Sequence, residues 1–322
     1  MNSHAFWAKI DSMFPFVLKR LLYAIPTLIA ISLLVFVVAR LAPSGPVEVI
    51  AGDKASPARI AEIKALYGLD KPVPVQYLDY VSGIVLHGDF GKSFQNGGEP
   101  ITALIKRGFP VTAQLALQAL LFALLLGLPT GVLAALYHNS WFDRLSMTIV
   151  VALVSVPSIV LGPLLVYLIA VRFGWLPTDG WETPASTILP MITLGARSAA
   201  LLARFMRASL LETLRQDYLR TAIAKGLSKK QAVWRHALKN ALLPVLTSIG
   251  TNFGVLLSGS FVVETIFRVP GIGFESINSI LKRDYPVMQG MALLVAAIFI
   301  LVNLGVDILY GVVDPRVKSQ EA

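Results

Sequence analysis

Residues 218–244 read YLRTAIAKGLSKKQAVWRHALKNALLP, which predicts two short basic helices joined at Gly226 and set between long apolar segments. Glycine suits the position just past a helix C-cap, where the backbone needs left-handed geometry. Ser228 then caps the second helix, and Gln231 three residues later completes a capping box. A loop between two membrane helices needs no such ordered element. We therefore expect this pair of helices to project from one membrane face and to contact a partner.

The composition indicates a membrane protein. Of the 322 residues, 55% are hydrophobic and only 15% are charged, whereas soluble domains carry about 25% charged residues. The formal net charge of +9 is typical of basic cytoplasmic loops. The chain has no cysteine, so a disulfide framework, a thiolate nucleophile and a cysteine metal site are excluded. Its four histidines are scattered without the spacing of a helical metal site, and no metal is expected.

Six segments are long and apolar enough to cross the hydrocarbon core, which takes about 20 residues of helix. Several contain proline, which membrane helices tolerate when neighbouring helices satisfy the freed carbonyl. The first segment lacks a small-residue cleavage site, so we expect a retained span and not a signal peptide. The expected spans are residues 21–39, 108–142, 145–171, 183–203, 240–263 and 285–306.

The distribution of basic residues predicts the orientation. Residues 42–107 pair seven basic with seven acidic residues, and the other connections on that side are similarly balanced. The opposite side is strongly basic, which marks it as cytoplasmic. The sequence therefore predicts an all-α integral membrane protein with six spans and both termini inside. The residues that carry this asymmetry are Lys9, Lys19, Arg20, Arg144, Arg204, Arg207, Arg215, Arg220, Lys225, Lys229, Lys230, Arg235, Lys239, Arg316 and Lys318.

The outer segment, residues 42–107, is expected to be ordered. Ser56-Pro57 predicts a helix start, with serine as N-cap and proline in the first turn, and Gly68 closes that helix. A second helix is expected to start near Pro74. We expect a small extracytoplasmic helical cap that seats a delivery protein, or a lid without a partner. Gly91-Lys92-Ser93 ends like a nucleotide-binding loop but lacks its first glycine, so no nucleotide site is expected.

The basic pair of helices admits two other interpretations. A small residue, a glycine four positions later and a capped basic helix also resemble a helix-turn-helix DNA reader. Both ends of this element continue into apolar segments, however, and a DNA reader would need a free module. No nucleic-acid partner is expected. The other alternative is a solvated basic loop held only by anionic lipid.

The same residues carry a family resemblance. Arg220-Thr221-Ala222-Ile223-Ala224-Lys225-Gly226, continued by residues 236–244, resembles the ATPase-coupling loop of ABC importer permeases of the peptide and nickel family. The general importer motif begins Glu-Ala-Ala, and its Leu-Pro comes five residues earlier. These departures are usual in the peptide branch. Further landmarks along the chain are Tyr67-Gly-Leu-Asp70, Gly88-Asp89-Phe90-Gly91, Glu264-Thr-Ile-Phe267, Pro270-Gly271-Ile-Gly273 and Arg283-Asp284-Tyr285-Pro286.

The resemblance implies a single transmembrane domain over residues 1–322, with a cap at 42–107 and a core bundle at 109–314 that includes a coupling loop at 207–240. It implies a multi-pass permease of the bacterial inner membrane that is not itself an enzyme and binds no cofactor. A second, homologous permease, two ATP-binding subunits that hold ATP and magnesium, and an extracytoplasmic substrate-binding protein are the implied partners. The residues implied to couple to the ATPase are Arg220, Thr221, Ala222, Ala224, Lys225, Gly226, Ser228 and Gln231.

Within the spans, ionisable and small residues suggest further roles. Arg197 interrupts the fourth span and either faces the pore, where it would attract a substrate carboxylate, or pairs with another helix. Asn252 is a second candidate for the translocation path. Asp307 is expected to form a structural ion pair with Arg204 or Arg207. Four glycines at small-xxx-small spacing predict close helix packing: Gly127, Gly131, Gly250 and Gly254.

Peptides, short or longer, are the expected cargo, because the spans lack clustered histidine or methionine that nickel would require. The competing interpretations are an ion-coupled secondary transporter, a nickel or peptide-like importer of the same family, and a non-transporting membrane scaffold. A secondary transporter would favour carboxylates at mid-membrane and internal repeats, and neither is evident. The sequence does not separate dipeptide, oligopeptide, glutathione and peptide antibiotic as cargo.

Overall fold

The chain is described by a computed structural model, which places residues 14–41, 56–95, 97–258 and 260–313. Across these ranges the chain is helical, and the only β-pairing in them is an isolated bridge between Lys92 and Pro100. Five helical stretches are long and apolar enough to cross a membrane, or six if one bent pair counts as a span. The long helices are α2 (Phe14–Leu41), α6 (Ile101–Leu136), α9 (Ile188–Leu214), α12 (Leu238–Ser258) and α15 (Tyr285–Val313).

The third expected span, 145–171, is not one continuous helix. It consists of α7 (Trp141–Ser155), then α8 (Ser158–Leu165) and the π-helix η1 (Val166–Arg172), and the two halves are bent by 107°. Pro157 at the break cannot donate a backbone hydrogen bond, and Val156 before it is extended with φ −86° and ψ 117°. The bent pair still counts as the third of six spans if its two halves cross the membrane together, and the apolar length on which the prediction rested does not reveal the bend.

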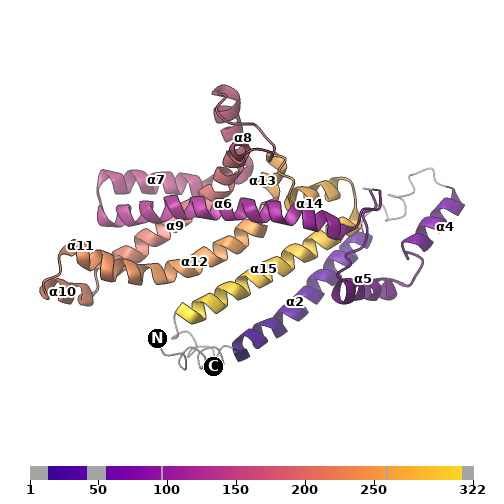
Figure 1. The fold of residues 1–322 in the computed structure, drawn as a ribbon, viewed down its shortest axis with the longest axis horizontal. Helices are drawn as coiled ribbons and strands as arrows, with labels where there is room; N and C mark the ends of the chain where they lie inside the picture. The colour runs from indigo at the N-terminus through magenta and orange to yellow at the C-terminus, as the bar shows by residue number, and fades with distance from the viewer. Residues whose placement is uncertain (1–13, 42–55, 96, 259, 314–322) are drawn as a thin grey trace.

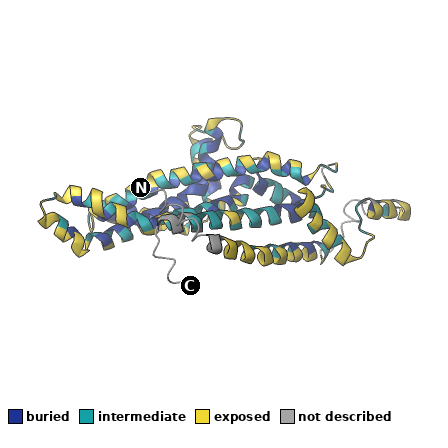
Figure 2. Cartoon of the chain, turned by 60° about the horizontal axis from the view of Figure 1, so that its bottom comes forward, coloured by how far each residue is buried: buried dark blue, intermediate teal, exposed yellow. Residues whose placement is uncertain are grey.

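Helices α6 and α9 form the centre of the bundle and α12 packs across them. Small residues line the contact: Ala116, Ala119 and Ala123 on α6 are fully buried. Large apolar side chains such as Leu125 and Leu126 point outward and remain exposed, as a helix in contact with lipid requires. Figure 2 shows this arrangement, with buried residues inside the bundle and exposed ones along its outer helices and at both ends.

The two ends of the bundle carry different elements (Figure 1). At one end lie α10 (Asp217–Ala224), α11 (Lys229–Ala232) and the π-helix η3 (Val233–Ala237). At the other lie α5 (Val73–His87), α14 (Ile272–Leu281) and the start of α6. Helix α13 (Phe261–Ile266) and the short 3-10 helix η2 (Pro184–Thr187) complete the described elements.

The outer helices follow the sequence prediction where the structure describes them. Helix α4 (Pro57–Leu66) ends before Gly68, whose φ is +63°, and α5 ends at Gly88, also with φ +63°. Helix α5 is tied to α2, because Arg40 donates to Gln76 at 2.5 Å and Tyr77 bonds Ser32 at 2.8 Å. The remainder of the expected cap, residues 42–55, lies outside the described residues.

Candidate functional site

The joint between α10 and α11 has the geometry of a complete helix stop. Gly226 has φ +96°, its amide donates to the Ile223 carbonyl at 2.9 Å, and the Leu227 amide donates to the Ala222 carbonyl at 3.3 Å. These two bonds are those of a Schellman motif, which closes the end of a helix. No heavy atom lies within 4 Å of the position that a Cβ on Gly226 would take. Glycine is therefore needed here for its backbone conformation and not for space.

The next helix starts with the expected capping box. The Gln231 amide donates to the Ser228 hydroxyl at 3.3 Å, and the Ser228 amide donates to the Gln231 side chain at 3.1 Å. This helix is not the separate short helix that the sequence suggested. It continues through η3 into α12, so that one helical stretch of 30 residues runs from Lys229 to Ser258. The sequence signal was the lack of any glycine or proline between Ser228 and Pro244.

Leu219 and one hydrogen bond hold the helix pair against the bundle, and a second hydrogen bond joins α9 to α12. Leu219 of α10 is 4% exposed and packs in a cluster with Leu210, Ala232 and other residues of α9 and α12. Asn240 donates to the Tyr218 hydroxyl at 3.0 Å, and Ser209 of α9 donates to the Ala241 carbonyl at 2.8 Å. The pair is thus fixed to the ends of α9 and α12.

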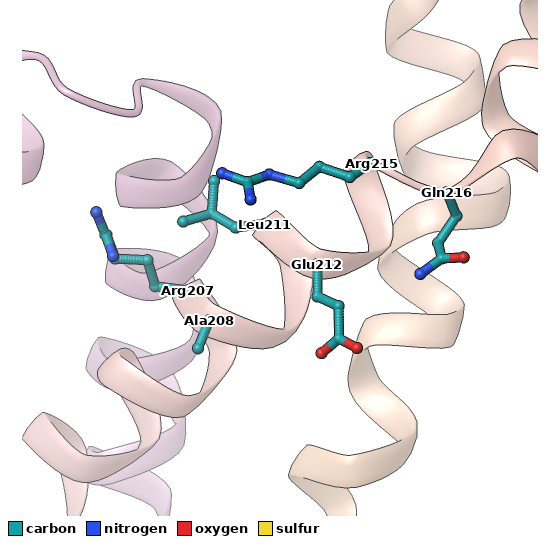
Figure 3. A pocket seen from close by; sticks show the side chains of 6 residues that line it. All are labelled: Arg207, Ala208, Leu211, Glu212, Arg215 and Gln216. Carbon is teal, nitrogen blue, oxygen red and sulfur yellow. The ribbon is translucent and has the colours of Figure 1, made fainter.

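Most residues that the resemblance assigns to coupling form one exposed surface. Arg220, Thr221, Ala224, Lys225, Gly226, Ser228 and Gln231 are exposed, and Ala222 is half-buried. Beside them, the end of α9 carries an open pocket of about 510 Å³ that is lined by Arg207, Ala208, Leu211, Glu212, Arg215 and Gln216. Figure 3 shows the Glu212 carboxylate pointing away from Arg215, so the two charges on this helix end do not face each other.

A charged cluster that the sequence did not reveal joins α7 to α9 near this surface. Arg207 donates from Nε to Asp143 Oδ1 at 2.6 Å and from Nη2 to Asp143 Oδ2 at 2.8 Å. The Asp143 side chain is only 3% exposed and also accepts from the Asn139 amide at 2.9 Å. His138 Nδ1 lies 3.2 Å from Arg207 Nη2. The bidentate pair fixes the start of α7 to α9, and no sequence pattern links residues 64 positions apart.

Arg207 is paired with Asp143, and the expected ion pair of Asp307 stays a prediction. Arg204, the other expected partner, is exposed, and the side chain of Asp307 lies outside the described residues.

The two candidates for the translocation path lie on adjacent helices. Arg197 is exposed on α9, although the residues on either side of it are buried. The Ser198 hydroxyl donates to Asn252 Oδ1 of α12 at 3.4 Å, which brings Asn252 next to this part of α9. Neither an ion pair nor a hydrogen bond joins the Arg197 side chain to another described residue, so the expected alternative of a helix partner is not found among them.

Three of the four glycines lie at tight helix contacts. A Cβ on Gly127 would come within 2.5 Å of the Ala199 carbonyl oxygen, and one on Gly131 would collide with the carbonyl oxygen of Ala203. A Cβ on Gly250 would collide with Val306 of α15, whereas one on Gly254 would make ordinary contacts at 3.5 Å or more. The glycines of α6 thus allow α9 to approach backbone to backbone.

Two buried carboxylates organise the other end of the bundle. Glu264 is fully buried and accepts from Thr112 at 2.8 Å, Ser260 at 2.5 Å and the Phe274 amide at 3.0 Å. Asp284 is 2% exposed and accepts from the Ser93 hydroxyl at 2.5 Å. Both lie in family landmarks, which was the only sequence signal for them. They tie α13, α14 and the loop before α6 together.

Among the described residues, no group of three or more histidine, aspartate or glutamate side chains could hold a metal ion. The chain has no cysteine that could add a ligand.

Comparison with known proteins identifies relatives over nearly the whole chain. The family described as the binding-protein-dependent transport system inner membrane component matches residues 127–319, and its N-terminal counterpart matches residues 13–116. The glutathione transport system permease proteins GsiC of Salmonella typhimurium and Escherichia coli K12 are each 44% identical over 306 residues, 95% of this chain and 99% of theirs.

Solved structures match the fold. The MetNI methionine ABC transporter in an inward-facing conformation gives a TM-score of 0.58 at 21% identity over 66% of this chain and 97% of the matched chain. An amino acid ABC transporter with histidines gives 0.50 at 21% identity over 67% and 94%. At this identity the likeness extends to the helical fold alone.

Proposed function

The chain belongs to the family of binding-protein-dependent transport system inner membrane components, as an ABC importer permease of the peptide type, and from this we propose that it forms half of a translocation path for peptides or peptide-like molecules. In this proposal the helix pair α10–α11 is the docking element for an ATP-binding subunit. ATP and magnesium are bound by that subunit, and this chain is not catalytic.

One observation carries the proposal. The pair α10–α11 presents an exposed basic surface, yet its backbone is closed by a Schellman motif and a capping box, and Leu219 anchors it to α9 and α12. An ordered surface of this kind resists deformation, so a movement of a bound partner would reach the bundle. A loop held only by lipid would not require such a joint, and a DNA reader would not be continuous with a membrane helix.

The proposed assembly contains a second, homologous permease, two ATP-binding subunits and an extracytoplasmic substrate-binding protein. In the proposed orientation α10 and α11 lie in the bacterial cytoplasm with both termini, and α5 and α14 lie outside the inner membrane. The ATPase would favour one of two states of the bundle, since a ligand shifts such an equilibrium only by its different affinity for the two.

The proposed cargo is a short peptide or a peptide-like thiol such as glutathione. The GsiC relatives are permeases of glutathione transport systems, which extends the cargo class beyond simple dipeptides and oligopeptides. Nickel is a weaker candidate, because no cluster of metal ligands is present among the described residues. An ion-coupled secondary transporter is the alternative that the experiment must separate.

The test uses the lack of cysteine in the chain. A Ser228→Cys variant in native vesicles, carrying a maleimide photo-cross-linker, is expected to join to a nucleotide hydrolase. The matched control is Ser82→Cys on α5, which is equally exposed but is expected to join only to extracytoplasmic proteins. ATP coupling is refuted by two results together. The Ser228→Cys variant joins to no hydrolase, and import continues after ATP is exhausted while the proton gradient is kept.

A further inference from the structure

Helix α9 is buried along most of its surface but keeps one face uncovered. Arg197, Arg204 and Arg215 are exposed on it, separated by seven and eleven residues. At about 3.6 residues per turn these spacings correspond to about two and three turns, so the three guanidinium groups lie along one face. The row covers about 27 Å at 1.5 Å per residue, from Arg197 inside the expected span to Arg215 at the cytoplasmic end of the helix. One exposed acid, Glu212, lies near that end, with its carboxylate pointing away from Arg215 (Figure 3).

The first position of this row, Arg197, is the most informative. Residues 193–196 and 198–200 are buried, so Arg197 emerges from an otherwise packed part of the bundle. Arg207, on another face of the same helix, is matched by Asp143, whereas Arg197 and Arg204 are bonded to none of the described residues. A guanidinium against lipid tails is costly, and such residues usually face water or a bundle interior. The uncovered face of α9 is therefore unsuited to contact with lipid.

Helix α12 brings polar groups to the same region. Thr247, Ser248, Thr251 and Asn252 occupy two successive turns, and all are exposed or half-buried. Asn252 accepts from Ser198, the residue next to Arg197, at 3.4 Å. Hydroxyl and amide groups on a helix that contacts the residue next to Arg197, whose guanidinium is bonded to none of the described residues, suit a polar, negatively charged ligand. They are unsuited to a metal cation, which the arginines would repel.

We infer that the uncovered face of α9, from Arg197 through Arg204 to Arg215 just past its end, is a carboxylate-binding track in the translocation path, and that Arg197, next in sequence to the Ser198 that bonds Asn252 of α12, is its site within the expected span. This inference rests on the proposed permease function and specifies its cargo as a molecule with at least one free carboxylate. The planar guanidinium binds a carboxylate through two parallel hydrogen bonds. Arginines spaced along the helix would provide several weak sites that bind the carboxylate one after another, and not one tight site.

Charge-selective labelling tests the track without knowledge of the cargo. In the assembled importer, Thr251→Cys is the chain's single cysteine, next to Asn252. The quantity measured is the ratio of the labelling rate by the anionic reagent MTSES to that by the cationic reagent MTSET. We expect this ratio to be higher at Thr251→Cys than at an exposed control cysteine, Ser82→Cys. A unit charge about 4 Å away changes a rate by about fivefold even in bulk water. Adding Arg197→Gln should lower the labelling ratio at Thr251→Cys by about this fivefold factor. Arg197→Lys should keep the ratio, and the control Arg144→Gln on α7 should leave it unchanged.

A transport assay completes the test. Proteoliposomes containing the whole importer are supplied with ATP and with glutathione or the dipeptide Ala-Ala. We expect Arg197→Gln to lower uptake at least about fivefold while ATP hydrolysis stimulated by the binding protein persists, and Arg197→Lys to restore most of the uptake. The inference is overturned if uptake and the labelling ratio are unchanged in Arg197→Gln. It is also overturned if the variant instead loses its partner permease on purification with an unchanged ratio, since Arg197 would then serve assembly. Absence of ATP-driven uptake by the unmodified importer would refute the proposed function itself.

Discussion

Replacing Gly226 by alanine isolates the backbone requirement of the α10–α11 joint. An added Cβ meets no heavy atom within 4 Å, so the substitution creates no clash. The cost comes from φ +96° alone, and left-handed geometry costs a residue with a Cβ about 1–2 kcal/mol. Relaxing φ to a negative value would break the bonds from Gly226 to Ile223 and from Leu227 to Ala222. Either response increases the population of the open joint by a factor of about 5–30.

Hydrogen exchange and transport measure this effect together. In the assembled importer, the Leu227 amide of Gly226→Ala should exchange about 5–30 times faster, and cargo imported per ATP hydrolysed should fall. Gly226→Asn should give a smaller change, because asparagine enters the left-handed region more readily. Gly174→Ala is the matched control: Gly174 has φ +66° and equally open surroundings, but lies outside the coupling pair. If both alanine variants reduce coupling equally, or if neither does, the assignment of the joint to coupling is refuted.

Gly131→Val should separate α6 from α9 and lower the free energy of unfolding by about 1–3 kcal/mol, because its Cβ would lie 2.8 Å from Met206 Cβ. Thermal unfolding in detergent checks this. Gly305→Val is the neutral control, since nothing lies within 4 Å of a Cβ there. Asp143→Asn should cost about 3 kcal/mol by leaving Arg207 without its charge partner, and a double-mutant cycle with Arg207→Gln should show coupling; additive effects would contradict the pairing. Glu264→Gln should cost about 1–3 kcal/mol by replacing an acceptor with a donor near Thr112, Ser260 or the Phe274 amide; unchanged hydrogen exchange at Phe274 would show that the carboxylate does not hold α13 to α14.

Local chemistry made several elements predictable from the sequence. Long apolar runs, one of them interrupted by Arg197, located the five long helices. A glycine after one helix and a serine before the next located the joint at Gly226 and the capping box of Ser228 and Gln231. These features depend on residues within a few positions of one another. The bend at Pro157 was missed because the segment was judged by its apolar length, although a residue before proline tends to be extended.

Contacts between distant segments could not be predicted. Asp143 and Arg207 each look like ordinary interfacial charges, and only the packing of α7 on α9 brings them together. Glu264 and Asp284 were visible only as parts of family landmarks, since their buried hydrogen bonds come from residues far along the chain or from backbone amides. Exposure of Arg197 likewise follows from which face of α9 the other helices cover.

The continuity of the helix from Lys229 to Ser258 has a mechanical consequence. At about 1.5 Å per residue, this helical stretch is roughly 45 Å long. Its capped start lies at the proposed docking surface, and Asn252 lies near its other end. In the proposed function, a push on the capped start would tilt or slide the part of α12 that lies near Arg197, because the helix is continuous between them. ATP hydrolysis and the opening of the translocation path would then be coupled in one step.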